Sequence, residues 1–373
     1  MGFLSEIYLE NFRNYTSQKL AFQAGLNIFA GENGHGKSNM LEAVYFLSLL
    51  RSFRCKNVQN LKNWKTDSFL INGRIKQDEA LDDQLQIQYG EKRVLKINDS
   101  SISKSSDFIR RINAVSFTPE DIELIKGSAG ARRQFIDITL SQISPSYLRH
   151  LLNYNKALKA RNTLLRNNED GKALDQSLFN TYEKMMVESG IIITRERIKL
   201  LNQFEDKIRH FTELMFPEGK KLKVIYQSSV FKSNKLEAVK EEVFQQKLDE
   251  SYTKDLQRGM TQIGPHRDDL FILLQGKSLS SFGSEGQCRL ASLVLKMTAA
   301  EQLIENDSTG NIVLLIDDVL GELDEQRKTA FLKTIMRGDQ VFIACTEIPE
   351  YCKSLEYSLY HVTNGVVTQE TSE

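Results

Sequence analysis

The spacing of glycine, lysine and serine between residues 31 and 40 could bind a phosphate group. The stretch reads GENGHGKSNM and matches G-x-x-x-x-G-K-[ST] through Gly31, Gly36, Lys37 and Ser38. Glycines at these positions let successive backbone N–H groups turn inward around an anion, and a following helix adds its positive end. Lys37 would reach the β- and γ-phosphates of a nucleotide, and the Ser38 hydroxyl would ligate Mg²⁺.

The whole loop is a candidate contact surface for that nucleotide. The alternative is a glycine-rich surface turn. The apolar run LNIF before the loop and the helical spacing of LEAVYFLSLL after it favour a strand, a phosphate loop and a helix in that order. The candidate contacts are Gly31, Glu32, Asn33, Gly34, His35, Gly36, Lys37, Ser38 and Asn39.

Two aspartates follow directly on a second apolar run. Five consecutive apolar residues, 312 to 316, precede Asp317 and Asp318, as is typical of a buried parallel strand whose carboxyl end faces a nucleotide. Asp317 would hold Mg²⁺, and Asp318 could orient or deprotonate the attacking water. The alternative is a strand that ends in a solvated acidic turn. With the phosphate loop, the pattern favours a Walker A and Walker B pair whose catalytic candidates are Lys37, Asp317 and Asp318.

A predicted helix start between these motifs offers a second anion-binding arrangement. In SFGSEGQCRLASLVLKM, Ser284 and Gly286 stand at the beginning of a helical run, so a hydroxyl, backbone N–H groups and the helix dipole converge there. Such a short motif is ordinarily a capped helix start. Its place after the phosphate loop and shortly before the acidic strand gives it weight, and the candidates are Ser284, Glu285, Gly286 and Gln287.

The composition is typical of a globular protein and does not indicate what the protein binds. With 373 residues and 40% hydrophobic residues, the chain can form two or three domains with a sizeable core. Lys and Arg number 49, as do Asp and Glu, so net charge indicates neither nucleic acid nor membrane. No apolar run approaches a membrane span and the first residues lack signal-peptide features, so we expect a cytoplasmic protein. The four cysteines include no C-x-x-C pair, which argues against a zinc-mediated contact between subunits.

Apolar periodicity predicts an α/β protein with a helical insertion. Residues 3 to 9, 26 to 30, 69 to 76, 84 to 90 and 92 to 97 are predicted strands. A long helix is predicted from the cap Ser144 and Pro145, and a second follows the polar turn RNNEDG and ends before Pro217 and Gly219. No sustained heptads occur, and the apolar stripes favour helix–helix packing over a groove for a partner.

The motif order resembles the ATP-binding-cassette plan, in which one subunit's signature helix covers the ATP of another. SEGQ is similar to that signature, and GELDEQR, with Leu323 and Asp324, is similar to the D-loop. Over nearly its full length the chain resembles the RecF family of bacterial recombination mediators, which are related to SMC-type ATPases. The stretches that carry the resemblance are LENFRNY, GENGHGKSNMLEAVYFLS, RSFR, FTPEDIELIKG, ARRQFID, GPHRDDL, the signature and LLIDDVLGELDEQR.

The resemblance implies an α/β fold, namely an ABC/SMC-type P-loop ATPase head with a mixed sheet, a mainly helical second lobe and no long coiled coil. Residues 1–120 and 217–373 would form the ATPase lobe, and residues 121–216 the helical lobe. It further implies a weak DNA-stimulated ATPase that uses ATP and Mg²⁺. ATP would drive a homodimer onto double-stranded DNA near gapped junctions, where it helps RecR and RecO to load RecA in recombinational repair, replication-fork recovery and the SOS response.

Some positions depart from related families. Asp318 stands where most SMC and cassette enzymes carry the longer glutamate, which suits the RecF family and suggests slow hydrolysis. Thr346 occupies the switch-histidine position. Glu120 and Asp121 occupy the glutamine-loop region without a definite role. In GPHRDDL, a turn with a solvated charge is as good an interpretation as a functional one.

Several arginines are candidates for nucleotide or DNA contacts. The related heads suggest that Arg13 contacts a nucleotide phosphate, although a lone arginine is otherwise a surface charge. DNA candidates are Arg51, Arg54, Arg132 and Arg133, together with the basic stretches TRERIK and GKKLK, all of which could be solvated faces.

Two other functions compete with an ATP-dependent DNA-binding protein. A small-molecule kinase or other metabolic NTPase would need neither the signature helix nor the D-loop. A transporter ATPase would show a glutamine loop and a switch histidine, and this chain shows neither clearly.

Overall fold

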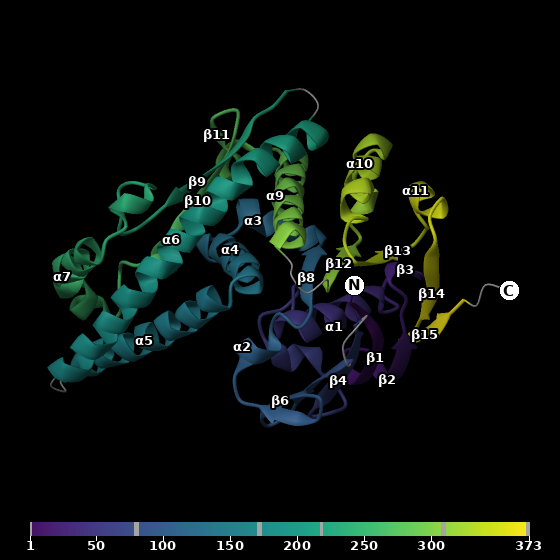
Figure 1. Ribbon diagram of the computed structural model, residues 1–373, viewed down its shortest axis with the longest axis horizontal. Helices are drawn as coiled ribbons and strands as arrows, with labels where there is room; N and C mark the ends of the chain where they lie inside the picture. The colour runs from purple at the N-terminus through teal and green to yellow at the C-terminus, as the bar shows by residue number, and fades with distance from the viewer. Residues whose placement is uncertain (1, 78–81, 170–173, 217–218, 307–310, 371–373) are drawn as a thin grey trace. The chain divides into compact units, whose positions relative to one another are not determined.

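The computed structural model describes residues 2–77, 82–169, 174–216, 219–306 and 311–370 (Figure 1). The chain divides into two compact units. Unit 1 comprises Met1–Asp121 and Leu293–Glu373, and unit 2 comprises Ile122–Ser292. Among the described residues, no helix is both long and apolar enough to span a bilayer.

A six-stranded, largely parallel sheet forms the centre of unit 1, in the order β15-β14-β3-β13-β12-β8. Its strands are β3 (Gly25–Ala30), β8 (Asn113–Phe117), β12 (Ile312–Asp317), β13 (Gln340–Cys345), β14 (Tyr357–Thr363) and β15 (Val366–Gln369). Every residue of β8 and β12 is buried, as expected of strands covered on both faces. Helix α1 (Lys37–Leu49) follows β3 through the phosphate loop and packs against β8, β12 and β13.

A second sheet in unit 1 is antiparallel, in the order β2-β1-β4-β5-β6-β7. Its strands are β1 (Phe3–Phe12), β2 (Tyr15–Ala21), β4 (Phe69–Lys76), β5 (Asp83–Tyr89), β6 (Arg93–Ile97) and β7 (Ser100–Ile102). The buried side-chain amide of Gln340 on β13 joins the two sheets: its Oε1 accepts from the Leu4 backbone N–H at 3.0 Å, and its Nε2 donates to the Leu4 carbonyl at 3.0 Å. Each polar group of this interior amide is thereby satisfied.

Shorter elements complete unit 1. They are η1 (Val58–Leu61), α2 (Ser105–Phe108), η2 (Pro119–Ile122), η5 (Leu320–Glu322), α10 (Glu325–Ile335) and α11 (Glu350–Lys353). Helix α9 (Glu285–Asn306) begins in unit 2 and continues into unit 1, so the division between the units falls within this helix.

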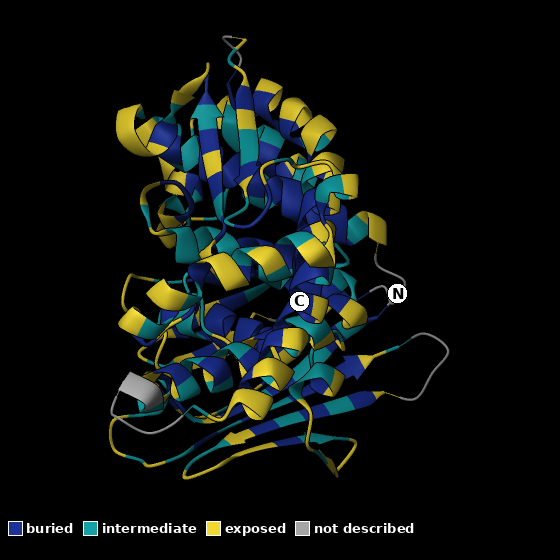
Figure 2. Ribbon diagram, turned by 90° about the vertical axis from the view of Figure 1, so that its left-hand side faces the viewer, coloured by how far each residue is buried: buried dark blue, intermediate teal, exposed yellow. Residues whose placement is uncertain are grey.

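Unit 2 is mainly helical. Its helices are α3 (Glu123–Lys126), α4 (Ala129–Ile143), α5 (Pro145–Glu169), α6 (Gln176–Met215), η3 (Leu236–Ala238), α7 (Glu241–Arg258), η4 (Pro265–Arg267) and α8 (Leu279–Phe282). A three-stranded sheet of order β11-β10-β9 completes it, with β9 (Leu222–Gln227), β10 (Asp269–Leu274) and β11 (Lys277–Ser278). The long helices α5 and α6 pack along each other, and α7 contacts both. Figure 2 shows helices that are buried on one side and exposed on the other, as amphipathic stripes require.

Two buried arginines hold the helices of unit 2 together. The fully buried Arg161 on α5 is ion-paired with Glu183 of α6 at 3.0 Å and with Asp255 of α7 at 2.9 Å. Arg197 of α6 is paired with Asp137 of α4 at 2.8 Å. Buried charges of this kind are tolerated because each has a partner and good hydrogen bonds.

The predicted elements compare well with these bounds. The five predicted strands correspond to β1, β3, β4, β5 and β6, and the Ser144 and Pro145 helix start is confirmed as α5, where the Ser144 hydroxyl accepts from the Tyr147 N–H at 3.1 Å. Helix α6 ends at Met215, and Pro217 lies outside the described residues. The strands that were not predicted are β2, β7, β8, β9, β10, β11, β14 and β15.

The expected return to the ATPase lobe at residue 217 differs from the observed division. Residues up to 292 group with unit 2, because β9 pairs with β10 and α7 packs on α5 and α6. The first boundary, expected after residue 120, falls after Asp121.

Candidate nucleotide site

The phosphate loop has a backbone that requires glycine. Gly31 has φ +154°, and a Cβ there would lie 2.4 Å from the carbonyl oxygen of Val362 on β14. Gly36 has φ +118° and stands at the start of α1. A side chain at either position would therefore strain the turn or collide with its neighbours. Such positive-φ glycines are typical of turns that bind an anion through backbone N–H groups.

Residues at the turn between β1 and β2 donate hydrogen bonds to the phosphate loop. The buried Tyr15 hydroxyl donates to the Gly36 carbonyl at 3.0 Å, and Asn14 Nδ2 donates to the His35 carbonyl at 3.0 Å. Asn39 Nδ2 in turn donates to Asn14 Oδ1 at 2.8 Å. Sequence reasoning did not assign Asn14 and Tyr15 to the site, although both belong to the stretch NFRNY.

The Lys37 ammonium is hydrogen-bonded to backbone carbonyls of the phosphate loop. Its Nζ donates to the carbonyls of Gly31 at 2.7 Å and Glu32 at 2.9 Å. Burial lowers the pKa of Lys37, and the nearby Asp318 and Asp317 carboxylates oppose that shift. The ammonium is therefore pre-positioned where the β- and γ-phosphates of a nucleotide would lie in a loop of this type.

Two oxygen donors of the kind that Mg²⁺ prefers lie together. The Ser38 hydroxyl donates to Asp317 Oδ1 at 2.7 Å, although 279 positions separate them in the chain. Burial raises the pKa of Asp317, and the Ser38 hydroxyl and the Arg54 guanidinium oppose that shift. Within the described part of the chain, no group of three or more His, Cys, Asp or Glu side chains could hold a metal ion. The residues fit a Mg²⁺ that is held by one carboxylate, one hydroxyl and substrate phosphates.

A cavity of about 190 Å³ brings the predicted catalytic candidates together. Loop residues of the range 33–39, including Lys37 and Ser38, line it with Asp317 and Asp318. Asp318 is exposed and has φ +54°, an uncommon conformation for a residue other than glycine. It follows directly on β12 and lines the cavity with Lys37 and Ser38, where a carboxylate can accept a proton from a water.

The predicted arginines fall into different environments in unit 1. Arg54 lines the same cavity and donates to Asn39 Oδ1 at 3.0 Å, so its position favours a nucleotide over DNA. Arg51 is exposed. Arg13 does not line the cavity; its guanidinium makes two hydrogen bonds of 2.8 Å to the buried carboxylate of Glu42 on α1.

In unit 2, Arg132 and Arg133 on α4 are engaged with the protein itself. Arg132 forms a bidentate pair with Asp269 at 2.7 and 3.0 Å, and Arg133 donates to the Asp268 carbonyl at 2.6 Å. The Asp269 carboxylate of GPHRDDL is thus paired with Arg132, whereas the Asp268 carboxylate accepts from the Tyr226 hydroxyl and the Ser229 N–H. His266 in the same stretch is also structural, since its Nδ1 lies 2.6 Å from the Tyr154 hydroxyl.

The signature stretch is an exposed, reciprocally capped helix start. Ser284 Oγ accepts from the Gln287 N–H at 3.2 Å, and Gln287 Oε1 accepts from the Ser284 N–H at 3.1 Å. Glu285 pairs with Arg289 at 2.8 Å, and nothing lies within 4 Å of a Cβ built on Gly286. The Ser284 hydroxyl accepts the capping bond and still has its own proton to donate to a ligand.

The remaining motif residues have local roles. In the D-loop stretch, Asp324 caps α10 by accepting from the Arg327 N–H at 2.9 Å, and Leu323 precedes it. Asp121 pairs with Lys296 at 3.1 Å, whereas Glu120 is close enough to Asp317 to contribute to its raised pKa. Thr346 is exposed after β13 and does not line the cavity.

The fold and the cavity define a nucleotide-binding unit of the P-loop ATPase class. Comparisons with known proteins identify the family of the chain. The family model described as "RecF/RecN/SMC N terminal domain" matches residues 3–368. The chain is 35% identical over 372 residues to the protein named "DNA replication and repair protein RecF" of Bacillus cereus (strain AH820), and the match covers 99% of each chain. The chain belongs to the RecF family.

Solved structures agree with this assignment. The structure described as "recombination mediator protein RecF-ATP in RecFOR pathway" is 33% identical, has a TM-score of 0.89 and covers 99% of this chain and 98% of its own. An Smc head domain from Pyrococcus furiosus, 13% identical with a TM-score of 0.58, covers 100% of this chain and 97% of its own and shares the fold. The expected ABC/SMC-type head is thus confirmed, and the comparisons do not favour a small-molecule kinase.

Proposed function

We propose that the protein binds and hydrolyses ATP to control its attachment to DNA during recombinational repair and replication. The observation that carries this proposal is the 2.7 Å hydrogen bond between Ser38 and Asp317, because it joins the phosphate loop to the acidic strand end in one cavity with Lys37 and Asp318. Membership of the RecF family supports the DNA-repair context.

The groups that line the cavity have different roles in ATP hydrolysis. Backbone N–H groups of the loop and Lys37 bind the β- and γ-phosphates of ATP. Ser38 and Asp317 would hold Mg²⁺, which would neutralise charge on those phosphates. Asp318 orients the attacking water, and its carboxylate is one methylene shorter than the glutamate that many related enzymes use. We therefore expect slow turnover, because small errors in the position of the water cost rate.

The exposed signature stretch supports a site shared between two copies of the chain. The phosphate loop supplies its own anion site, so Ser284 to Gln287 would serve the ATP held by a partner subunit. ATP would then act as an intersubunit bond, and its hydrolysis would release the dimer from DNA. By resemblance, the partners are duplex DNA with gapped junctions, RecR with RecO, and RecA as the protein to be loaded, in a cytoplasmic setting.

Mixing two inactive variants tests the shared site. Lys37→Met removes the phosphate-facing cation, and Ser284→Arg blocks the signature, so each homodimer should be inactive. A mixed dimer contains one site with both lesions and one site with neither, so partial ATPase activity should return on mixing. Subunit exchange is verified separately with fluorescently labelled chains. Confirmed exchange without recovered activity would show that the signature does not act across the dimer.

The DNA-dependent ATPase activity is tested with purified protein. ATP turnover should rise with duplex DNA and with protein concentration, because both favour the dimer. The matched control is Asp318→Asn, which should bind ATP without turning it over. Stimulation by a small phosphoryl acceptor in place of DNA would reject the proposal in favour of a kinase.

A further inference from the structure

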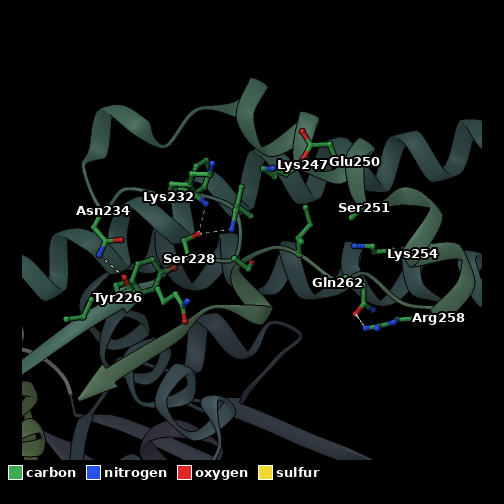
Figure 3. Close-up of a pocket in the computed structure, with 16 residues that line it drawn as sticks. Tyr226, Ser228, Lys232, Asn234, Lys247, Glu250, Ser251, Lys254, Arg258 and Gln262 are labelled. Carbon is green, nitrogen blue, oxygen red and sulfur yellow. Dashed lines mark hydrogen bonds and ion pairs between the residues drawn. The ribbon is translucent and has the colours of Figure 1, made fainter. Parts of the chain in front are cut away.

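A large groove of about 940 Å³ lies in unit 2, and none of its lining residues belongs to the phosphate loop (Figure 3). Its walls are the end of β9 with the loop that follows it, the helix α7, and the turn at Gln262 and Ile263. None of the motifs in the sequence predicted a role for these residues. All of its lining residues belong to unit 2.

Positive charge dominates this basic groove. Four of its lining side chains are cations, namely Lys232, Lys247, Lys254 and Arg258, and Glu250 is its one carboxylate. Lys247 pairs with Glu250 at 2.5 Å and, with a smaller contribution from Lys232, lowers the pKa of that carboxyl. Lys232 and Lys254 are exposed, and no described acidic side chain lies within 4.0 Å of either ammonium.

The cations form a row along one face of α7. Lys247, Lys254 and Arg258 are separated by seven and four residues, which corresponds to about 10 Å and about 6 Å of helix. Lys232 extends the row from the loop opposite, as Figure 3 shows. An extended chain of negative charges would match this arrangement better than a single small anion.

The other lining groups favour phosphodiesters over an acidic peptide. Ser228, Asn234 and Gln262 line the groove, and each already bonds within the protein. The amides of Asn234 and Gln262 each have a second N–H that can donate to nucleic-acid phosphate or sugar. Of its apolar lining residues, Val230 and Phe231 are each 4% exposed and Ile225 and Ile263 are half-buried, so none is an exposed anchor. A protein partner would normally find an exposed apolar or aromatic anchor at the centre of its interface.

We propose that the basic groove between the β9 loop and α7 binds the sugar-phosphate backbone of DNA. This inference rests on the proposed DNA-binding function and assigns it a place in unit 2. It replaces Arg132 and Arg133, whose guanidinium groups are already engaged with Asp269 and Asp268. Such contacts position DNA without reading its sequence.

The test uses the full-length protein with ATP and a fluorescein-labelled duplex, titrated by anisotropy at several salt concentrations. The variant carries Lys232→Ala and Lys254→Ala. Removing two phosphate contacts should lower the slope of log affinity against log salt by about 1.8 and weaken binding by roughly 10- to 60-fold near 0.1 M salt. The matched control carries Lys156→Ala and Lys159→Ala, which remove the same charge from exposed positions on α5 outside the groove. The control should keep the wild-type slope.

Each outcome has a distinct meaning. A groove variant with the wild-type slope and affinity would overturn the inference and leave the proposed function intact, as would an equal loss in the control. If the groove variant loses binding of a glutamate polymer but not of DNA, the groove takes an acidic peptide and the inference is wrong. Wild-type protein that binds no duplex would reject the proposed function itself, and the inference with it.

Discussion

From the ion pair between Arg13 and Glu42, we expect that Arg13 stabilises the fold of unit 1 and does not contact a nucleotide phosphate. The Glu42 carboxylate is fully buried, and it accepts two hydrogen bonds of 2.8 Å from Arg13 and one from the Ser52 hydroxyl. Arg13→Ala removes the cation and leaves the carboxylate in the interior of unit 1. The variant therefore separates a stabilising role from the phosphate contact that the related heads suggest.

The magnitude follows from the burial of the pair. Removing one partner of a buried ion pair costs about 3–5 kcal/mol. The Arg13 side chain is 21% exposed, so water can reach the vacated site and the lower end of that range applies. At about 2–4 °C per kcal/mol for a unit of this size, Arg13→Ala should lower Tm by about 6–12 °C.

Differential scanning calorimetry without nucleotide measures this shift. The matched control adds Glu42→Gln, which still accepts from Ser52 but carries no charge, and should recover more than half of the lost Tm. Affinity for a fluorescent ATP analogue, measured well below Tm, should change by less than about threefold. Unchanged Tm together with a loss of ATP affinity of about tenfold or more would refute the structural role and make Arg13 a phosphate ligand.

The remaining predictions concern the cavity and one buried histidine. Lys37→Met should abolish tight ATP binding in a fluorescent-nucleotide titration. Asp318→Asn should still bind ATP but not hydrolyse it, and light scattering should show an ATP-bound dimer. An Asp318→Asn protein that stays monomeric with ATP would contradict the idea that ATP joins the two subunits. Burial lowers the pKa of His266 to about 4, so between its unfolded pKa and about 4 the unfolded chain binds a proton that the folded chain does not. Stability should therefore fall by at most about 3 kcal/mol as the pH decreases through that window, and urea unfolding of His266→Gln should show a flatter pH dependence.

The site could be predicted from sequence where chemistry leaves few choices. A phosphate loop needs glycine at Gly31 and Gly36 because the backbone there has positive φ and close neighbours. The acidic strand end was recognisable because a fully buried parallel strand is a continuous apolar run. In the structure the two motifs meet through Ser38 and Asp317, as the Mg²⁺ hypothesis requires.

Other features were not predictable, for physical reasons. Strand β8 contains the polar residues Asn113 and Ser116, so its short apolar pattern was ambiguous, yet all five of its residues are buried. The sequence also does not reveal whether an arginine is solvated or paired, and Arg132 proved to be paired with Asp269. The boundary at residue 292 depends on which strands pair, and a strand pattern alone does not specify its partner.

The position of β3 has a consequence for how the protein is made on the ribosome. The hydrogen-bonded neighbours of β3 are β13 and β14, which are synthesised more than 300 residues later. At about 5–20 residues per second, roughly 15–70 s separate the emergence of β3 from that of β14. Unit 2 is one continuous segment and can fold during this interval, whereas the strand that carries the phosphate loop must wait. A nascent chain therefore gains the ability to bind nucleotide only after β13 and β14 have emerged. Until then the unpaired edges of β3 are the segment that most needs protection from aggregation.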